Sequence, residues 1–212
     1  MEGFRKISSK QYPDITLRVI PGHFVTANSH VNYFIDMSMM KARQSEAESI
    51  AEALAERYVA TTVVDTIVCM DGCEVIGAYL AENLTKMGVI SINAHKTIYI
   101  TTPEFRSDGQ LLFRENIQPM IRNKHVLLLL ASATTGKTVS SAIDVIRYYG
   151  GVVAGISAIF SAASSVQHLP INALFTTADI PDYKTFTHEN CAMCAASQPI
   201  DALVNSYGYS KF

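Results

Sequence analysis

The chain has 212 residues, of which 49% are hydrophobic and 17% are charged, and its formal net charge at pH 7 is -2. A chain of this size can bury a substantial core in one domain, and its near-neutral charge excludes the basic surface of a nucleic-acid-binding protein. No apolar run approaches the roughly 20 residues of a membrane helix, and the N-terminal residues lack the apolar stretch of a signal peptide. We therefore expect a cytoplasmic protein that contacts neither nucleic acid nor membrane.

The N-terminal third predicts strands followed by a helix. Residues 15–36 read as two short strands, and the first extended run ends at Pro21 and Gly22. Residues 41–58 predict an amphipathic helix because apolar side chains recur at helical spacing on one face, namely Ala47, Ile50, Ala51, Leu54 and Tyr58.

A buried strand and a second helix come next. Residues 61–70 are β-branched and apolar almost throughout, as in a strand covered on both faces, and Asp71 to Cys73 break this run. A helix should follow over residues 74–86, with Gly88 near its end. The remaining expectations for this part are short strands at 89–92 and 97–101 and an exposed loop at 103–110.

The C-terminal half repeats the pattern of buried strands and amphipathic helices. A strand is predicted at 125–130, a helix with its apolar face at Val139, Ala142, Ile143, Ile146 and Tyr149, and further strands at 152–160 and 172–176. Gly150 and Gly151 stop the helix. This alternation indicates an α/β fold with an open, mostly parallel sheet flanked by helices, and ligands bind such sheets at the carboxyl ends of the strands.

One stretch at such a strand end suggests a phosphate site. Residues 131–138, ASATTGKT, fit a loose P-loop pattern in which Ala131 replaces the first glycine. A P-loop NTPase would place Lys137 on the terminal phosphates and Thr138 on Mg²⁺, and it needs a further acidic residue for the metal. Only Asp65 or Asp71 could supply it. A P-loop NTPase therefore stays the lesser alternative.

A longer window, residues 125–160, resembles the phosphoribosyltransferase signature, in which a buried strand leads to Thr-Thr-Gly and then to a helix. Residues 22–38 (GHFVTANSHVNYFIDMS) and 64–81 (VDTIVCMDGCEVIGAYLA) are similar to the amino-terminal segment and pyrophosphate loop of orotate phosphoribosyltransferases. ENCAMC at 189–194, followed by Pro-Ile-Asp, resembles their P-x-x-C-P-L-C segment. The matched pieces occur in family order along most of the chain.

The resemblance to orotate-phosphoribosyltransferase-like, type I phosphoribosyltransferases implies one domain over residues 1–212, with a small hood from about 1–40 and 180–212. It also implies a homodimer. The family's reaction transfers ribose 5-phosphate from phosphoribosyl pyrophosphate to orotate in the presence of Mg²⁺. A small phosphoribosyl or nucleotide ligand is therefore the expected partner.

The resemblance also assigns site residues. The 5-phosphate would lie on the residues that begin a helix, Thr134, Thr135, Gly136, Lys137 and Thr138. The base pocket would contain Tyr33, Phe34 and Asp36, and the pyrophosphate loop would contain Asp71, Gly72, Cys73 and Glu74. The competing structural interpretations are a helix cap at Thr134, core aromatic residues, and an acidic, solvated start of a helix.

The sequence departs from the family pattern at three places that matter for catalysis. We therefore assign no catalytic residue. Leu130 and Ala131 stand where the family has two adjacent acidic residues, so the usual acceptors for the ribose hydroxyls are replaced. Glu74 stands at a family glycine and would repel a pyrophosphate. The family's mobile basic loop is reduced to His95, Lys96 and Arg106. A transferase and a catalytically impaired nucleotide-binding or regulatory paralogue therefore stay open as alternatives.

The four cysteines are expected to be thiols or metal ligands, because four are too few for a disulfide scaffold. Cys191 and Cys194 form a single CxxC with His188 nearby, which predicts either half of a Zn²⁺ site or packed free thiols. Cys69 and Cys73 could complete the site if the tail folds back over them. Other histidines, such as His23 and His30, show no partner spacing and are interpreted as turn or helix-face residues.

Overall fold

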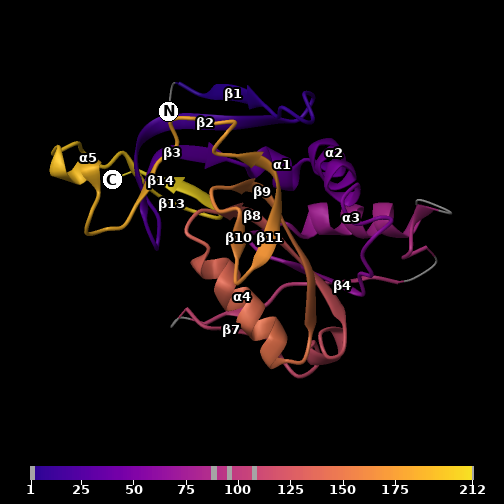
Figure 1. Ribbon diagram of the computed structural model, residues 1–212. Helices are drawn as coiled ribbons and strands as arrows, with labels where there is room; N and C mark the ends of the chain where they lie inside the picture. The colour runs from indigo at the N-terminus through magenta and orange to yellow at the C-terminus, as the bar shows by residue number, and fades with distance from the viewer. Residues whose placement is uncertain (1–2, 87–89, 95–96, 107–108, 212) are drawn as a thin grey trace.

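A computed structural model describes residues 3–86, 90–94, 97–106 and 109–211. Its core is a six-stranded sheet with the order β10-β11-β9-β8-β4-β5, and Figure 1 shows this sheet beside a second one. Neighbouring core strands are parallel except for β10 and β11. The bounds are β4 Thr66–Cys69, β5 Tyr99–Thr101, β8 His125–Ala133, β9 Val152–Ser161, β10 Ser165–Val166 and β11 Leu169–Thr176.

Helices cover both faces of the core sheet, which explains the run of four leucines in β8. Leu127 and Leu129 pack in one apolar cluster with helices α2 (Gln44–Ala55) and α3 (Glu74–Lys86). Leu128 and Leu130 point the other way, into a second cluster with helix α4 (Lys137–Tyr148). All four leucines are fully buried, as expected for a parallel strand covered on both sides.

The second sheet, which we call the hood, combines both ends of the chain. Its strand order is β12-β3-β2-β13-β14, and β1 also pairs with β2. Strand β13 runs parallel to β2, so the C-terminal tail lies directly beside an N-terminal strand. The bounds are β1 Arg5–Ser8, β2 Thr16–Val25, β3 His30–Asp36, β12 Thr185–Phe186, β13 Ala202–Asn205 and β14 Gly208–Ser210.

The hood shares its core with the first face of the central sheet. Leu17, Val19, Phe24 and Phe34 of the hood belong to the same apolar cluster as helices α2 and α3. Two short helices adjoin the hood strands: α1 (Ser38–Ala42) follows β3, and α5 (Ala192–Ala195) lies between β12 and β13. This common core fixes the position of the hood over the carboxyl ends of the central strands.

The predicted open, mostly parallel α/β sheet with flanking helices is confirmed, and several predicted boundaries are wrong. Strand β2 continues past Pro21 and Gly22, because a bulge between Pro21 and Phe24 absorbs the irregularity. The helix expected at 41–58 is divided, and α2 begins at Gln44 after the separate α1. Helix α3 has the predicted bounds.

The segment between α3 and β8 differs most from prediction. Residues 90–92, the described part of the strand expected at 89–92, form a 3₁₀ and turn segment, and Gly88 lies outside the described residues. The loop expected at 103–110 contains β6 (Glu104–Phe105), which pairs with β7 (Leu111–Leu112), and η2 (Gln118–Met120) follows. Among the described residues, no helix is both long and apolar enough to cross a membrane.

Candidate functional site: a cavity between hood and core

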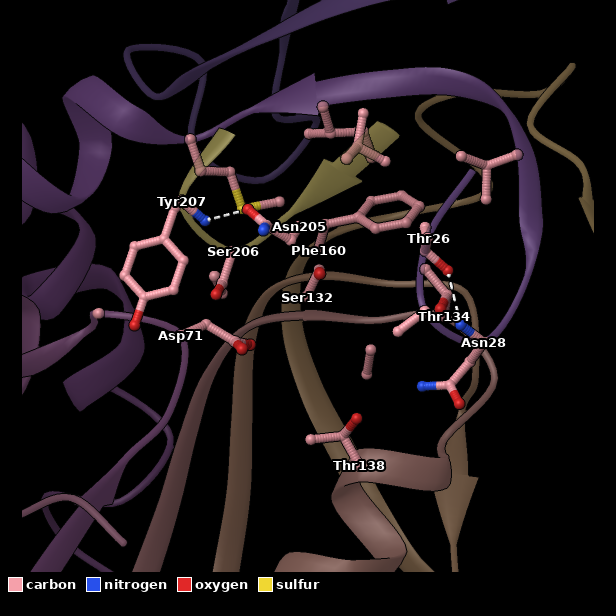
Figure 2. Close-up of a pocket in the computed structure, with 18 of the residues that line it drawn as sticks. Thr26, Asn28, Asp71, Ser132, Thr134, Thr138, Phe160, Asn205, Ser206 and Tyr207 are labelled. Carbon is pink, nitrogen blue, oxygen red and sulfur yellow. Dashed lines mark hydrogen bonds between the residues drawn. The ribbon is translucent and has the colours of Figure 1, made fainter. Parts of the chain in front are cut away.

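A cavity of about 590 Å³ lies between the hood and the carboxyl ends of β4 and β8. This volume is in the range of small-molecule sites. Four segments form most of its wall: the β2–β3 turn, the loop after β4, the β8–α4 connection and the β13–β14 turn. Figure 2 shows side chains from all four around one space, among them Asn28, Asp71, Thr138 and Tyr207. The cavity therefore lies at the strand ends where the sequence predicts a ligand.

The start of α4 forms one wall of the cavity. All five residues predicted to hold the 5-phosphate, 134–138, line the cavity. Gly136 precedes the helix with a left-handed backbone (φ 76°), and a Cβ atom there would lie 2.8 Å from Val166 Cγ2. Only glycine fits without strain. The first amides of a helix have no partner within that helix, so this turn can donate hydrogen bonds to a phosphate.

The loop after β4 brings a carboxylate to the end of β8. Asp71 has a positive φ of 58°, and the backbone amides of Ala131 and Ser132 lie close enough to its carboxyl group to lower its pKa. Burial raises the pKa of the Asp71 carboxyl above its usual range, and Glu74 adds to this effect, although Lys41 and the two amides oppose it. An acidic group thus lies beside Ala131, although neither Leu130 nor Ala131 is acidic.

Lys41 is a cavity residue that the sequence did not single out. Its Nζ atom donates hydrogen bonds to the backbone oxygens of Asp71, at 2.7 Å, and Ser206, at 2.6 Å. One cation from α1 therefore joins the loop after β4 to the C-terminal tail. The sequence contains no signal for this, because the three residues are brought together only by the packing of the hood on the core.

The other predicted residues divide between cavity and core. Gly72 and Glu74 line the cavity, and Glu74 Oε1 accepts a hydrogen bond of 2.9 Å from Thr102 Oγ1. Cys73 is fully buried and is absent from the cavity wall. Burial raises the pKa of its thiol well above the usual range, with a further contribution from Asp71.

The predicted base pocket is only partly assembled. Tyr33 and Phe34 line the cavity, and the Phe34 ring packs 5.3 Å from the ring of Tyr209. Asp36 lies outside the cavity wall, where its Oδ1 accepts a hydrogen bond of 3.0 Å from the Ser38 amide. The role of Asp36 in this structure is to order the turn into α1, which its position two residues before Ser38 could have suggested.

Sequence reasoning also missed two turns of the hood. Thr26 Oγ1 accepts hydrogen bonds from the amides of Asn28 and Ser29 and closes the β2–β3 turn at the cavity rim. Residues 204–208 enter the wall from the β13–β14 turn, and Tyr207 is 93% exposed there. The Asn-Ser-Tyr-Gly sequence at 205–208 is a turn signal that could have located this hairpin.

The basic loop and the cysteines lie in different surroundings. His95 and Lys96 lie outside the described residues, and Arg106 is in the β6–β7 hairpin. Cys191 and Cys194 lie beside His23 and His30 instead of beside Cys69 and Cys73. None of the four cysteines, all within the described ranges, forms a disulfide.

Comparisons with known proteins agree with this geometry. No protein-family model matches the chain. The orotate phosphoribosyltransferase of Chlorobium phaeobacteroides (strain BS1) is 24% identical over 185 residues, which cover 87% of this chain and 88% of the relative. That of Desulforamulus reducens is 23% identical over 186 residues and covers 85% of this chain and 87% of the relative.

Solved structures show the same fold. The orotate phosphoribosyltransferase of Aeropyrum pernix superposes with a TM-score of 0.54 at 21% identity, covering 76% of this chain and 89% of that chain. The Mycobacterium tuberculosis enzyme in complex with Fe(III) dicitrate gives a TM-score of 0.52 at 15% identity, covering 77% of this chain and 92% of that chain. The chain is orotate-phosphoribosyltransferase-like. This phosphoribosyltransferase-like fold does not support the P-loop NTPase alternative.

Proposed function

We propose that this orotate-phosphoribosyltransferase-like protein binds phosphoribosyl pyrophosphate or a nucleoside monophosphate in the cavity between hood and core. The carrying observation is the turn at 134–138, which presents free helix amides and Lys137 to the cavity. Tyr33 and Phe34 of the hood line the same cavity, where a base could stack. A Mycobacterium tuberculosis structure of this fold is a complex with phosphoribosyl pyrophosphate, which supports the ligand class.

Asp71 supports transfer of the phosphoribosyl group as a second function. Its carboxylate lies at the amides of Ala131 and Ser132, beside the two positions where the family carries acids. In the transfer, the ribose C1–oxygen bond to pyrophosphate breaks, pyrophosphate leaves with the electron pair, and a ring nitrogen of a pyrimidine-like base bonds to C1 and loses its proton. A carboxylate beside C1 would stabilise the positive charge that develops there.

The oxygen ligands at the cavity fit Mg²⁺. Asp71 and Glu74 both line it, and Mg²⁺ in phosphate-handling sites is typically held by one or two carboxylates together with substrate phosphates. When bound, the ion would neutralise charge on the leaving pyrophosphate. In this chain Lys41 lies on the same side, where its Nζ contacts the Asp71 carbonyl oxygen.

Ligand-induced thermal stabilisation tests the binding proposal. We expect ribose 5-phosphate, nucleoside monophosphates and phosphoribosyl pyrophosphate to raise the melting temperature, because a ligand that binds only the folded state stabilises it. Lys137→Glu places a negative charge at the helix start and should abolish the shift. Lys86→Glu makes the same charge change at the exposed end of α3 and should keep it. Equal shifts in both variants would refute a phosphate site at α4.

A separate assay tests transfer. The protein is incubated with phosphoribosyl pyrophosphate, Mg²⁺ and orotate or another pyrimidine-like base, and released pyrophosphate is measured. Turnover that is lost in Asp71→Ala would establish the transferase, with Asp71 as a catalytic residue. Ligand-induced stabilisation without turnover on any base would leave a binding protein and exclude transfer.

A further inference from the structure

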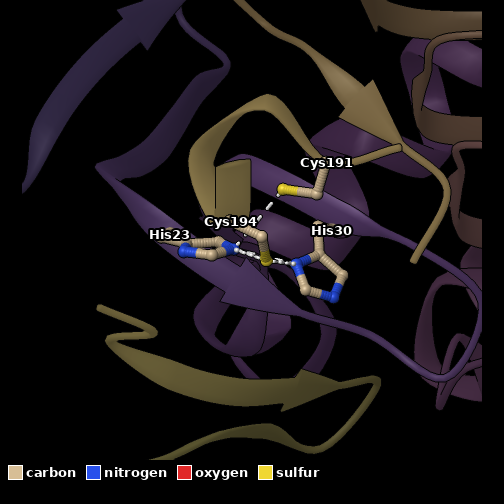
Figure 3. Close-up of side chains that lie close together, drawn as sticks. All are labelled: His23, His30, Cys191 and Cys194. Atoms are coloured by element: carbon tan, nitrogen blue, oxygen red, sulfur yellow. Dashed lines mark hydrogen bonds between the residues drawn. The ribbon is translucent and has the colours of Figure 1, made fainter. Parts of the chain in front are cut away.

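Four metal-ligating side chains from three segments converge outside the cavity. His23 comes from β2, His30 begins β3, and Cys191 and Cys194 flank the start of α5. Their donor atoms all lie within 4.8 Å of one another, and Figure 3 shows the four side chains pointing toward a common centre. We call these four residues the His/Cys cluster. It is the only such group of three or more His, Cys, Asp or Glu side chains in the described part of the chain.

The sulfur–nitrogen distances in the cluster match those around a tetrahedral zinc ion. Cys191 Sγ and Cys194 Sγ lie 3.6 and 3.7 Å from His23 Nε2, and Cys194 Sγ lies 3.5 Å from His30 Nδ1. Usual zinc bond lengths place a nitrogen and a sulfur ligand about 3.6 Å apart and two nitrogen ligands about 3.3 Å apart. His23 Nε2 and His30 Nδ1 are 2.8 Å apart, so a small outward movement completes the tetrahedron.

The ring of His23 is oriented as a metal ligand. Its Nδ1 atom donates a hydrogen bond of 3.0 Å to the Gln198 carbonyl oxygen, which leaves the lone pair of Nε2 directed into the cluster. The backbone is fixed as well, because the His23 amide donates to Asp201 Oδ2 at 2.7 Å and the Asp201 amide donates to the His23 carbonyl oxygen at 2.8 Å. A hydrogen bond from the second ring nitrogen to a carbonyl group is the usual support of a zinc-bound histidine.

The local backbone is shaped to bring this side chain inward. The bulge in β2 places His23 and its neighbour Phe24 both in fully buried positions, although consecutive strand residues normally face opposite sides. A Cβ atom on Gly22 would lie 2.6 Å from Asp201 Oδ2, so the tail approaches β2 closely only because residue 22 is glycine.

We propose that His23, His30, Cys191 and Cys194 bind one structural Zn²⁺ ion. Two thiolates and two imidazoles form a complete Cys₂His₂ set, which leaves no open position for a substrate and is typical of structural zinc. Binding releases the two thiol protons and needs His30 to carry its proton on Nε2. Cys194 is exposed, so the ion can enter from solvent.

The zinc ion would fasten the C-terminal tail to β2 and β3, the N-terminal strands of the hood. The tail contacts β2 at two places, first through the cysteines of the cluster at 191–194 and then through Asp201. Strand β13 pairs with β2 directly after these contacts. The turn that follows β13 forms part of the cavity wall. The zinc site would thus take no direct part in binding the ligand of the cavity, but it would support one side of the cavity wall.

Metal analysis of the purified 212-residue chain tests this proposal. We expect about one zinc ion per chain, and a chelator should remove it and lower the melting temperature because binding energy of this kind is folding energy. Co²⁺ added to the chelated protein should give the visible bands of a tetrahedral thiolate site. Cys194→Ser and His30→Gln should each lower the bound zinc at least tenfold and weaken the Co²⁺ bands.

Two control variants separate this cluster from other sets of ligands. His188→Gln changes an exposed ring whose centroid lies 5.0 Å from that of His30, and Cys69→Ala removes a buried thiol of β4. Both should keep one zinc ion per chain. The proposal is overturned if the wild type binds neither Zn²⁺ nor Co²⁺ at micromolar concentrations, if both controls lose the metal, or if mass spectrometry finds a Cys191–Cys194 disulfide in the freshly purified protein.

Discussion

At the scale of single residues, Asp71 brings a carboxyl group to the end of β8, where neither Leu130 nor Ala131 is acidic. Leu130 is fully buried against α4 and Ala131 is 5% exposed, so both side chains belong to the core. The exposed residue of this strand end is Ser132, which lines the cavity, and the backbone amides of Ala131 and Ser132 lie near the Asp71 carboxylate. The acidic group at this edge of the cavity therefore comes from the loop after β4.

The raised pKa of Asp71 leads to a pH-dependent prediction. A group whose folded pKa exceeds its unfolded value stabilises the protein fully below the unfolded pKa and loses this contribution as the pH rises through the folded pKa. Asp71→Asn cannot ionise, so we expect it to be more stable than the wild type at pH 8, with a difference that closes toward pH 3. Urea denaturation across this range measures it.

The same variant should bind ribose 5-phosphate more tightly without Mg²⁺ at pH 8, by about threefold or more, because a negative charge is removed from the cavity. Asp36→Asn, outside the cavity wall, is the control and should leave this affinity unchanged. Weaker binding by Asp71→Asn would show that the carboxylate itself contacts the ligand.

At the scale of elements, Tyr58 connects the end of the first long helix to the central sheet. Its hydroxyl group donates to the Ile156 carbonyl oxygen or Ser157 Oγ of β9 and accepts from Asn172 Nδ2 of β11, with distances of 2.7 to 3.1 Å. The side chain is 3% exposed. Burial raises the pKa of this phenol, which keeps it neutral.

Tyr58→Phe should therefore lower the free energy of unfolding by about 1 to 3 kcal/mol, because buried polar groups on β9 and β11 lose their partner. Chemical denaturation measures this loss. Tyr148→Phe is a matched control, since Tyr148 is 82% exposed on α4, and it should change stability by less than about 0.5 kcal/mol. Equal effects of the two variants would contradict a bridging role for Tyr58.

Helices and strands whose apolar side chains recur at regular spacing were predictable from sequence, and very short strands were not. The bounds of α3 and the buried stretch of β8 follow from local patterns of apolar side chains. Strands β10 and β12 have two residues each, which is too short to show a regular spacing of apolar side chains, and β12 is held by β3, a strand distant in the chain. The bulge at Gly22 also broke the alternation that would have marked β2 as one strand.

At the scale of the whole molecule, the parts of the candidate site that lie in one continuous stretch were predictable from sequence, and the parts assembled from distant segments were not. The turn at 134–138, where we predict the 5-phosphate, is one continuous stretch, so its sequence alone could place it in the cavity wall. His23 and Cys194 are 171 residues apart, and Lys41 and Ser206 are 165 apart. Such residues meet because the tail pairs with an N-terminal strand in the hood sheet and the hood packs on the core. No spacing rule within one segment can reveal such contacts.

Lys41 offers a test of whether one cation holds the loop after β4 and the C-terminal tail together, because its Nζ atom donates a hydrogen bond to each of them. Hydrogen bonds to a charged group are worth about 1.5 to 3 kcal/mol each. Lys41→Met leaves both carbonyl oxygens without this donor and removes a cation from the cavity. We expect about a tenfold or greater rise in the dissociation constant for ribose 5-phosphate, and faster proteolysis within residues 204–208.

Lys10→Met is the matched control for this coupling. Lys10 Nζ also donates to a backbone oxygen, that of Ala178 at 2.9 Å, but it lies outside the cavity wall. This variant should keep the ligand affinity and the rate of tail cleavage, even if it melts at a slightly lower temperature. If Lys41→Met also kept both, the tail and the loop after β4 would be held by the hood sheet alone, and the cation would have no part in joining them.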